Sequence, residues 1–303
     1  MPKSVTSLTG YIRKIERLSN ASTGDLFYRG HPDISFTLTP SVFRSSSLKK
    51  NEKNIIYRAM AESPKEFDRD KYFFDKLVRA QHYGIPTRLL DLTVNPLIAL
   101  YFACESHTKN RGQIVVLDVP KGSTKFFLSD AVSCKSNLAQ LSPVEHTSLK
   151  LCILASCEKV LGEKFKRKKL LDWREEFPDK WKDVIENFNK YRNARRLTQF
   201  IREEKPHFEG KIDPIDLLKP DVILPKKSNS RIAAQSGAFL GFGLNDLLSD
   251  NNLIRHNIKK TVIDISEESK HNFLIALGSI GISESFVYPE FDRAAKQIKK
   301  LFS

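Results

Sequence analysis

The sequence predicts an α+β fold. Three observations lead to this class: short β-branched runs bounded by turn residues, stretches of helical periodicity between them, and enough apolar residues for a buried core. The chain has 303 residues, of which 40% are hydrophobic and 10% aromatic. This composition excludes an intrinsically disordered chain and a small disulfide scaffold. The length fits either two domains or one elaborated domain.

The first segments of the chain predict helix, strand and helix. Residues 6–20 carry apolar positions at helical spacing, with Ser7 or Thr9 as the cap. The segment 25–30, DLFYRG, predicts a short strand that ends on an arginine and a glycine. A helical pattern extends over 51–82 and is interrupted by a Ser-Pro pair.

A second strand and its following helix come next. The segment 83–96, YGIPTRLLDLTVNP, holds two prolines around a short apolar run, which predicts a loop, a strand and a loop. Asn95 then caps a helix with Pro96 in its first turn, because both residues are typical of a helix N-terminus. The run 112–120, GQIVVLDVP, is continuously apolar and β-branched, which predicts a strand buried on both faces.

The rest of the chain divides into a charged middle and a C-terminal part. Strands are expected at 221–225, 231–243 and 261–265, and helices at 267–279 and 290–302. The middle is helix-prone, rich in runs such as KFKRKK, and contains Trp173 and Trp181. It is either a solvated helical pair or an arm that binds a partner. We therefore expect a core formed by 1–157 and 211–303, with a basic helical insertion at 158–210.

The charge of the chain favours a polyanionic partner. Lys and Arg number 50 against 36 Asp and Glu, a net charge of +14. RNA, single-stranded DNA or an acidic protein such as an antitoxin or chaperone would fit this excess, and so would no partner at all. In the basic middle, Tyr191 and Phe200 stand among the cations, where bases could stack.

Targeting and metal signals are missing from the sequence. The N-terminus has no apolar signal region, and no run of about 18 apolar residues occurs, so we expect a cytoplasmic protein without a membrane partner. The four cysteines are scattered, and Cys152 and Cys157 fit buried thiols on a helix. No His or Cys cluster has the spacing of metal ligands, so no metal is expected. Phosphate-binding glycine loops and a nucleophile elbow are also missing.

Two segments concentrate polar residues in apolar surroundings. Tyr28-Arg29-Gly30 ends the first strand, where an arginine beside a glycine suits a phosphate or a carboxylate. Such an arginine could instead pair with a core carboxylate, for which Asp91 is the candidate. The second segment, 82–103, interleaves polar and apolar side chains, so its polar groups must satisfy one another or line a cavity. Its polar members are His82, Tyr83, Thr87, Arg88, Asp91, Thr93 and Asn95.

Five blocks of the sequence resemble the FRG domain family. They occur in the order of the family and span nearly the whole chain, but they leave the basic middle unexplained. The blocks are YRG at 28–30, TPSVFR at 39–44, QHYGIPTRLLDLTVNPLIALYFA at 81–103, RIAAQSGAF at 231–239 and GISESFVYPEFDRAAKQI at 281–298.

The sequence also resembles the arginine-type ADP-ribosyltransferases. In that superfamily a strand ends in Tyr-Arg-Gly and its arginine holds NAD, and a second strand leads into a helix with Ala-x-x-Phe-Ala. Arg29 matches the first motif and Thr93 the middle of the second, with Asp91 where its first serine would be. Ala99, Phe102 and Ala103 match the helix. The resemblance implies a split β-sheet core, NAD as the substrate, and a toxin or anti-phage role with RNA as a possible acceptor.

Site residues follow from this resemblance. It implies catalytic roles for Arg29, Asp91, Thr93 and Gln235, which should converge on one pocket. It implies NAD binding by Tyr28, Arg29, Gly30, His82, Tyr83, Arg88, Thr93 and Phe239. Arg88 would be a second phosphate anchor, and Tyr28, Tyr83 or Phe239 would form a wall for nicotinamide.

The third transferase motif departs from the pattern. Gln235-Ser236-Gly237 has the glutamine but a glycine where the catalytic glutamate would stand. Asp91 or Glu284 could replace it, or the reaction could rely on a bound phosphate or on the substrate itself. The remaining alternatives are a module that binds a nucleotide or nucleic acid without turnover, and a toxin subunit that acts through protein interaction.

Overall fold

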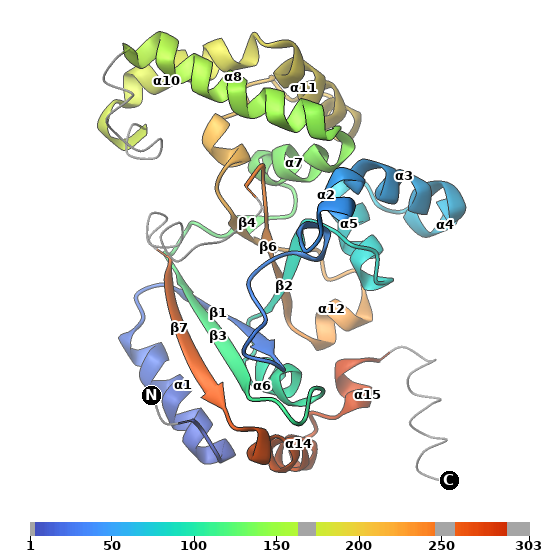
Figure 1. Ribbon diagram of the computed structural model, residues 1–303, viewed down its shortest axis with the longest axis vertical. Coiled ribbons are helices and arrows are strands. Elements are labelled where there is room, and N and C mark those ends of the chain that lie inside the picture. The colour runs from blue at the N-terminus through green and yellow to red at the C-terminus, as the bar shows by residue number, and fades with distance from the viewer. Residues whose placement is uncertain (1–3, 163–173, 246–257, 290–303) are drawn as a thin grey trace.

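Seven strands of the described chain pair into one sheet, in the order β4-β5-β6-β2-β1-β3-β7. The computed structural model describes residues 4–162, 174–245 and 258–289. All neighbouring strands are antiparallel except β4 and β5, and helices pack around the sheet, so the α+β prediction is confirmed (Figure 1). The strands are β1 Asp25–His31, β2 Leu89–Thr93, β3 Gly112–Val119, β4 Lys125–Phe126, β5 Asp221–Leu224, β6 Gly237–Gly241 and β7 Lys259–Ile265.

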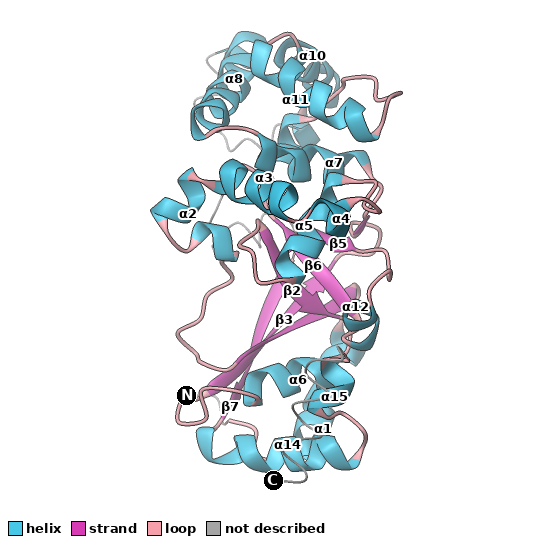
Figure 2. Cartoon of the chain, turned by 90° about the vertical axis from the view of Figure 1, so that its right-hand side faces the viewer, coloured by secondary structure: helices cyan, strands magenta, loops and turns pink. Residues whose placement is uncertain are grey.

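The helices gather at the two ends and along one side of the sheet (Figure 2). The α-helices are α1 Leu8–Ala21, α2 Ser46–Lys50, α3 Glu52–Glu62, α4 Pro64–Phe67, α5 Phe73–His82, α6 Pro96–Cys104, α7 Asp130–Asn137, α8 Pro143–Leu161, α10 Pro178–Asn189, α11 Arg192–Glu204, α12 Ser230–Ala234, α14 Lys270–Ser279 and α15 Glu284–Val287. Short 3-10 helices are η1 Ser41–Phe43, η2 Leu138–Gln140, η4 Pro214–Leu217 and η5 Glu267–Ser269.

The sheet is nearly divided between β1 and β2. Within these two described strands the register holds a single pair, Tyr28 with Thr93. By contrast, β1 pairs with β3 along its whole length, from Asp25 with Val119 to His31 with Gln113. The three strands β1, β3 and β7 therefore form one part of the sheet, and β2, β6, β5 and β4 form the other. A space between the two parts opens beyond the Tyr28–Thr93 pair.

Helix α6 covers one face of β1, and the sequence explains why it starts where it does. The side chain of Asn95 accepts a hydrogen bond from the amide of Leu97, and Pro96 occupies the first turn, as predicted. A Cβ atom on Gly30 would lie 2.0 Å from the carbonyl oxygen of Ala99. Gly30 is therefore needed because the backbones of β1 and α6 approach so closely.

The charged middle contributes to a separate helical core. Helices α7, α8, α10 and α11 share an apolar cluster that includes Leu149, Trp181, Val184 and Leu197. Trp181 is buried and its Nε1 donates to Asp213 Oδ1 at 3.2 Å. Residues that join this cluster come from before 158 and after 210 as well, so the middle helices pack as part of a larger unit. Trp173 and the cations at 164–169 lie outside the described residues.

One predicted element is wrong and another cannot be compared. The expected strand at 231–243 begins with helix α12, and only Gly237–Gly241 forms strand β6. The reason is the N-cap: the side chain of Asn229 accepts a hydrogen bond from the amide of Arg231 at 2.7 Å and starts a helical turn. The helix expected at 290–302 lies outside the described residues.

Candidate functional site

A cavity of about 270 Å³ opens beside the point where β1 and β2 separate. We call it the Arg29 cavity. Its volume is at the lower limit of typical small-molecule sites, which are about 300–1,000 Å³. The charged side chains that line it are Arg29, Arg44, Asp91, Glu105 and Arg231. Its aromatic side chains are Tyr28, Phe36, Phe102 and Tyr288.

Arg29 is the central cation of the cavity. Its Nη1 donates to the backbone oxygen of Asp91 at 2.5 Å, which links β1 to β2 beyond their last pair. The Asp91 carboxylate is 3.9 Å from the same nitrogen, so it attracts the guanidinium without a direct hydrogen bond. Burial lowers the pKa of Arg29 to about 10, and Asp91 opposes this change. Arg29 is therefore charged at neutral pH and keeps donors available for an anion.

His31 is a neutral ring that accepts a hydrogen bond from Arg29. Arg29 Nε donates to His31 Nε2 at 2.9 Å, and a guanidinium can only donate, so this imidazole nitrogen must be the acceptor. Burial, Arg29 and Arg44 lower the pKa of His31 to about 3. The ring thus carries one proton, on Nδ1, and fixes the orientation of the guanidinium plane.

Asp91 is the exposed carboxylate of the cavity. Its side chain is 61% exposed, although the strand around it is buried. Gln81 Nε2 donates to Asp91 Oδ1 at 2.7 Å, and Thr87 Oγ1 donates in turn to Gln81 Oε1 at 2.5 Å. This chain of hydrogen bonds positions the carboxylate and leaves Oδ2 on the side of Arg29.

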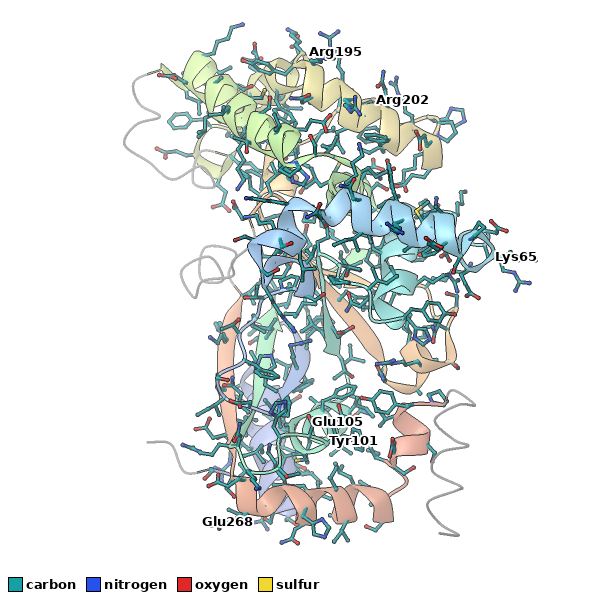
Figure 3. All side chains as sticks on the ribbon, turned by 45° about the vertical axis from the view of Figure 1, so that its right-hand side comes forward. Lys65, Tyr101, Glu105, Arg195, Arg202 and Glu268 are labelled. Carbon is teal, nitrogen blue, oxygen red and sulfur yellow. The ribbon has the colours of Figure 1, made fainter. Side chains whose placement is uncertain are left out.

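The other walls bring together residues that are distant in the sequence. Arg44 is anchored by its Nε, which donates to the Thr39 carbonyl at 3.2 Å. Arg231 stacks over the ring of Tyr288 at 4.8 Å. The Tyr288 hydroxyl lies 2.8 and 3.0 Å from the two carboxylate oxygens of Glu105, which ties the segment after α15 to the end of α6. Figure 3 shows Glu105 close to Tyr101 of α6.

Thr93 and Gln235 hold the floor of the cavity. The buried Thr93 hydroxyl donates to the Gln235 carbonyl at 2.6 Å and accepts from the Asn95 amide at 2.9 Å. Gln235 Nε2 donates to the carbonyl of Val287 at 3.1 Å. Ser236 has a φ of 47°, a left-handed conformation that is uncommon for a serine. These bonds fix the turn from α12 into β6 against β2, so both side chains have structural partners.

Comparison with known proteins identifies part of this architecture. Residues 24–112 match the FRG domain family. The chain carries an FRG domain. The comparisons with curated proteins and with solved structures gave no match. The FRG domain contains Arg29, Arg44, Asp91, Thr93 and Glu105, whereas Arg231, Gln235 and Tyr288 come from the following part of the chain. The cavity is therefore completed by segments outside the matched range.

The structure brings together Arg29, Asp91, Thr93 and Gln235 in one cavity, along with Tyr28 and Gly30. Tyr28 is buried, and burial raises its pKa. The close neighbour of Gly30 is helix α6. Gly30 thus allows the close packing of β1 on α6 and also lines the cavity.

The remaining predicted residues lie elsewhere. Arg88 is buried, pairs with Glu52 through 2.8 and 2.5 Å hydrogen bonds and lies outside the cavity lining, so its charge serves the fold. Tyr83 is exposed and its hydroxyl donates to Glu66 at 2.7 Å. His82 and Phe239 line a small neighbouring hollow, where Phe239 also packs edge-to-face on Phe74. Glu284 is not among the residues of the cavity wall.

Several polar lining residues are not among the residues selected from the sequence: His31, Arg44, Glu105, Arg231 and Tyr288. A signal existed for each of them. Arg44, Arg231 and Tyr288 lie inside blocks that resemble the FRG family, His31 directly follows YRG, and Glu105 comes two residues after the long block. The FRG-like blocks and their immediate neighbours therefore contain these five residues, but they also contain Tyr83 and Arg88, which lie outside the cavity wall.

The described residues contain no group of three or more His, Cys, Asp or Glu side chains placed to hold a metal ion. In the same part of the chain, no helix combines the length and apolar character needed to cross a membrane. Cys152 and Cys157 lie on helix α8 as free thiols, and burial raises the pKa of Cys157 to about 12. These cysteines therefore act as packing residues.

Proposed function

We propose that the Arg29 cavity binds NAD and transfers its ADP-ribose group to an acceptor. One observation carries the proposal: a cation from β1 and an exposed carboxylate from β2 line the same cavity where the sheet separates. Arg29, with Arg44 and Arg231, would hold the diphosphate, since guanidinium groups bind phosphate oxygens well. Tyr288 or Phe102 would pack against the nicotinamide ring.

The charges of the cavity suit the reaction. Cleavage of the bond between ribose C1′ and the nicotinamide nitrogen leaves its electron pair on the nitrogen, which converts a cationic ring into neutral nicotinamide. Positive charge then develops on the ribose, and a carboxylate close to C1′ stabilises it. The acceptor heteroatom forms the new bond to C1′ and releases a proton, which Asp91 can take up and pass to water.

Two features of the chain support Asp91 as this carboxylate. Arg29 and Thr93, which match two of the transferase motifs, lie on the neighbouring strands β1 and β2, and Asp91 is two residues before Thr93. Gly237 leaves no acid at the usual place on β6, while Glu105 is bound to the Tyr288 hydroxyl. The two acids of the described wall, Asp91 and Glu105, are both exposed, but the Glu105 carboxylate already accepts from the Tyr288 hydroxyl, whereas the Asp91 side chain is 61% exposed and within reach of a substrate.

Product analysis tests the proposal. The purified chain is incubated with NAD, and released nicotinamide is measured by chromatography. Arg29→Ala should lose both binding and release, whereas Asp91→Asn should keep NAD binding within a few-fold and lose about 100-fold or more in release. The matched control is Asp179→Asn, which removes an exposed acid on α10 and should leave both values unchanged. NAD binding by the wild type without release, also when a cell lysate supplies acceptors, would contradict transfer.

The second candidate is a nucleotide-binding module without turnover. It is favoured by Gly237 and by the hydroxyl of Thr93, whose hydrogen bonds go to the protein backbone. The same incubation distinguishes the two functions, because a module that only binds NAD releases no nicotinamide. The toxin or anti-phage role, and RNA or an acidic antitoxin as partner, stay predictions of the resemblance and the charge.

A further inference from the structure

Two further spaces extend from the Arg29 cavity toward helices α5 and α12. A connecting hollow of about 70 Å³ shares Asp91, Leu92, Arg231 and Gln235 with the cavity. On its other side it shares Val78, His82 and Ile232 with an open groove of about 280 Å³. We call this the α5–α12 groove. Both helices lie on the same side of β2 and β6 (Figure 1). The shared lining residues place the hollow between the cavity and the groove.

Asp91 stands at the junction of these spaces. Its side chain lines both the Arg29 cavity and the connecting hollow. Gln81, which orients the carboxylate, belongs to the wall of the hollow. A group-transfer reaction needs this arrangement, because donor and acceptor must reach the same carbon from different directions.

The groove differs in charge from the cavity. The cavity has three arginines against two acids, whereas the groove has Asp70 and Asp75 against Arg79 and Lys226. Asp70 and Arg79 neutralise each other through two hydrogen bonds of 2.6 and 2.8 Å. Asp75 is half-buried, and burial raises its pKa, while Lys226 opposes this change. Its carboxyl oxygens are acceptors that a donor on a ligand could meet.

We propose that the α5–α12 groove binds the acceptor, and that the acceptor is a polypeptide side chain with a donor-bearing nitrogen or hydroxyl. This inference rests on the proposed function of the Arg29 cavity. The groove has as many basic as acidic side chains and therefore offers no net positive charge to a phosphodiester, which argues against nucleic acid at this place. The exposed arginines Arg195 and Arg202 lie on α11, at the far end of the molecule from α12 (Figure 3).

The reaction balances with these partners. The acceptor attacks C1′ of the nicotinamide ribose from the connecting hollow. The C1′–nitrogen bond breaks, the acceptor–C1′ bond forms, nicotinamide leaves with the electron pair, and the acceptor proton passes through Asp91 to water. Water in the same hollow would give free ADP-ribose by the same step.

Transfer to defined probes tests the groove. The chain is incubated with NAD labelled in its adenylate group and with synthetic peptides that differ only in a central Lys, Arg, Asn or Ser; total RNA is the parallel arm. We expect label on at least one peptide and none on RNA. Asp75→Lys should lower peptide labelling roughly tenfold, because it repels donors, and Lys226→Glu should raise it. The control Asp179→Lys should change nothing.

The outcomes are distinct. Asp75 also accepts a hydrogen bond from the Tyr72 amide, so Asp75→Asn serves as a second variant that keeps an oxygen for this contact. NAD affinity, measured on the same preparations, should be unchanged in all groove variants. Label on RNA alone, or peptide labelling that is equal in the wild type and the Asp75 variants, overturns the acceptor groove while NAD binding stands. A wild type that binds no NAD overturns the proposed function itself.

Discussion

Arg29 and Arg88 are both largely buried arginines, but they have different partners. Removing each of them should therefore affect stability differently. The side chain of Arg88 and that of its partner Glu52 are 2% and 3% exposed, so a variant without the arginine leaves a buried carboxylate unpaired. Arg29 pairs with a backbone oxygen, a neutral histidine and the exposed Asp91. Burial alone therefore does not separate a ligand-binding arginine from a structural one, but the partners do.

This contrast gives a matched pair of variants. Arg88→Ala should lower the free energy of unfolding by about 3–5 kcal/mol. Arg29→Ala should cost less, about 1–3 kcal/mol, because it leaves two neutral acceptors, His31 Nε2 and the Asp91 backbone oxygen, without their donor and no buried charge unpaired. Urea denaturation measures both values, and NAD titration shows whether Arg29→Ala stays folded without binding. Equal destabilisation by the two variants would count against a binding role for Arg29.

The lowered pKa of His31 predicts that the stability of the fold depends on pH. Its pKa falls from 6.5 to about 3 on folding, so the unfolded chain binds more protons between these values. The stability that the neutral ring contributes is present above pH 6.5 and is lost as the pH falls toward 3. Between pH 6.5 and 5 the loss should be about 2 kcal/mol.

The test compares the wild type with His31→Gln, whose amide oxygen can still accept from Arg29. Urea denaturation at pH 7 and pH 5 should show a smaller loss in the variant by about 2 kcal/mol. Other shifted groups, such as Glu204 and His146, contribute equally to both proteins and cancel. The same pH dependence in both proteins would show that His31 is not the group that titrates.

At the scale of elements, Gly30 controls how close β1 lies to α6. Gly30→Ala would place a Cβ atom 2.0 Å from the Ala99 oxygen and 2.7 Å from the Ala103 nitrogen. Since both neighbours are backbone, one element must move, and we expect a loss of about 1–3 kcal/mol or more. Helix α6 carries Phe102 and ends beside Glu105, so NAD affinity should fall as well.

Gly278→Ala is the control for this variant. Gly278 lies in α14 with nothing within 4 Å of an added Cβ atom, so alanine should be neutral or stabilise the helix by about 0.5–1 kcal/mol. Urea denaturation and NAD titration of the two variants are compared with the wild type. A Gly30→Ala protein as stable as the control would mean that the close approach does not constrain the fold.

Local patterns predicted most elements of the FRG domain and its surroundings. Strand β3 has a continuous β-branched run, and α6 has Asn95 and Pro96 at its start, so short-range chemistry specifies both. The strand prediction for 231–243 was wrong at its start. Asn229, just before this segment, caps a helical turn that the apolar content of the segment does not indicate. The sequence could select Arg29 and Asp91, but the choice between Arg88 and Arg231 as cavity cations depended on tertiary contacts with Glu52 and Tyr288.

For the whole molecule, the net charge of +14 raises the question of a polyanionic partner. Several cations of the middle helices already have acidic partners: Arg196 lies 2.7 Å from Glu145 and Lys190 lies 2.7 Å from Glu186. Arg195 donates to the Lys190 carbonyl at 2.8 Å and remains exposed. These ion pairs reduce the number of cations that can bind a phosphate without first breaking an ion pair.

We therefore expect weak, salt-dependent binding of single-stranded RNA. Each phosphate contact contributes a slope of about −0.7 to log affinity against log salt, so a five-contact footprint would give about −3.5. With Lys190 and Arg196 paired, the slope should be shallower than this value. Fluorescence titrations from 50 to 300 mM salt measure it, with an Arg195→Ala/Arg196→Ala double variant. A slope steeper than about −3.5 would show that these ion pairs open on binding.

The central claim is that the Arg29 cavity, formed where the sheet separates, holds NAD with its reactive ribose at Asp91. The most direct measurement is a crystal structure of the Asp91→Asn variant with NAD, since this variant should bind the dinucleotide without cleaving it. We predict diphosphate oxygens within hydrogen-bond distance of Arg29 and the nicotinamide ribose C1′ beside residue 91. NAD bound at another surface, or in this cavity with its ribose away from residue 91, would contradict the account.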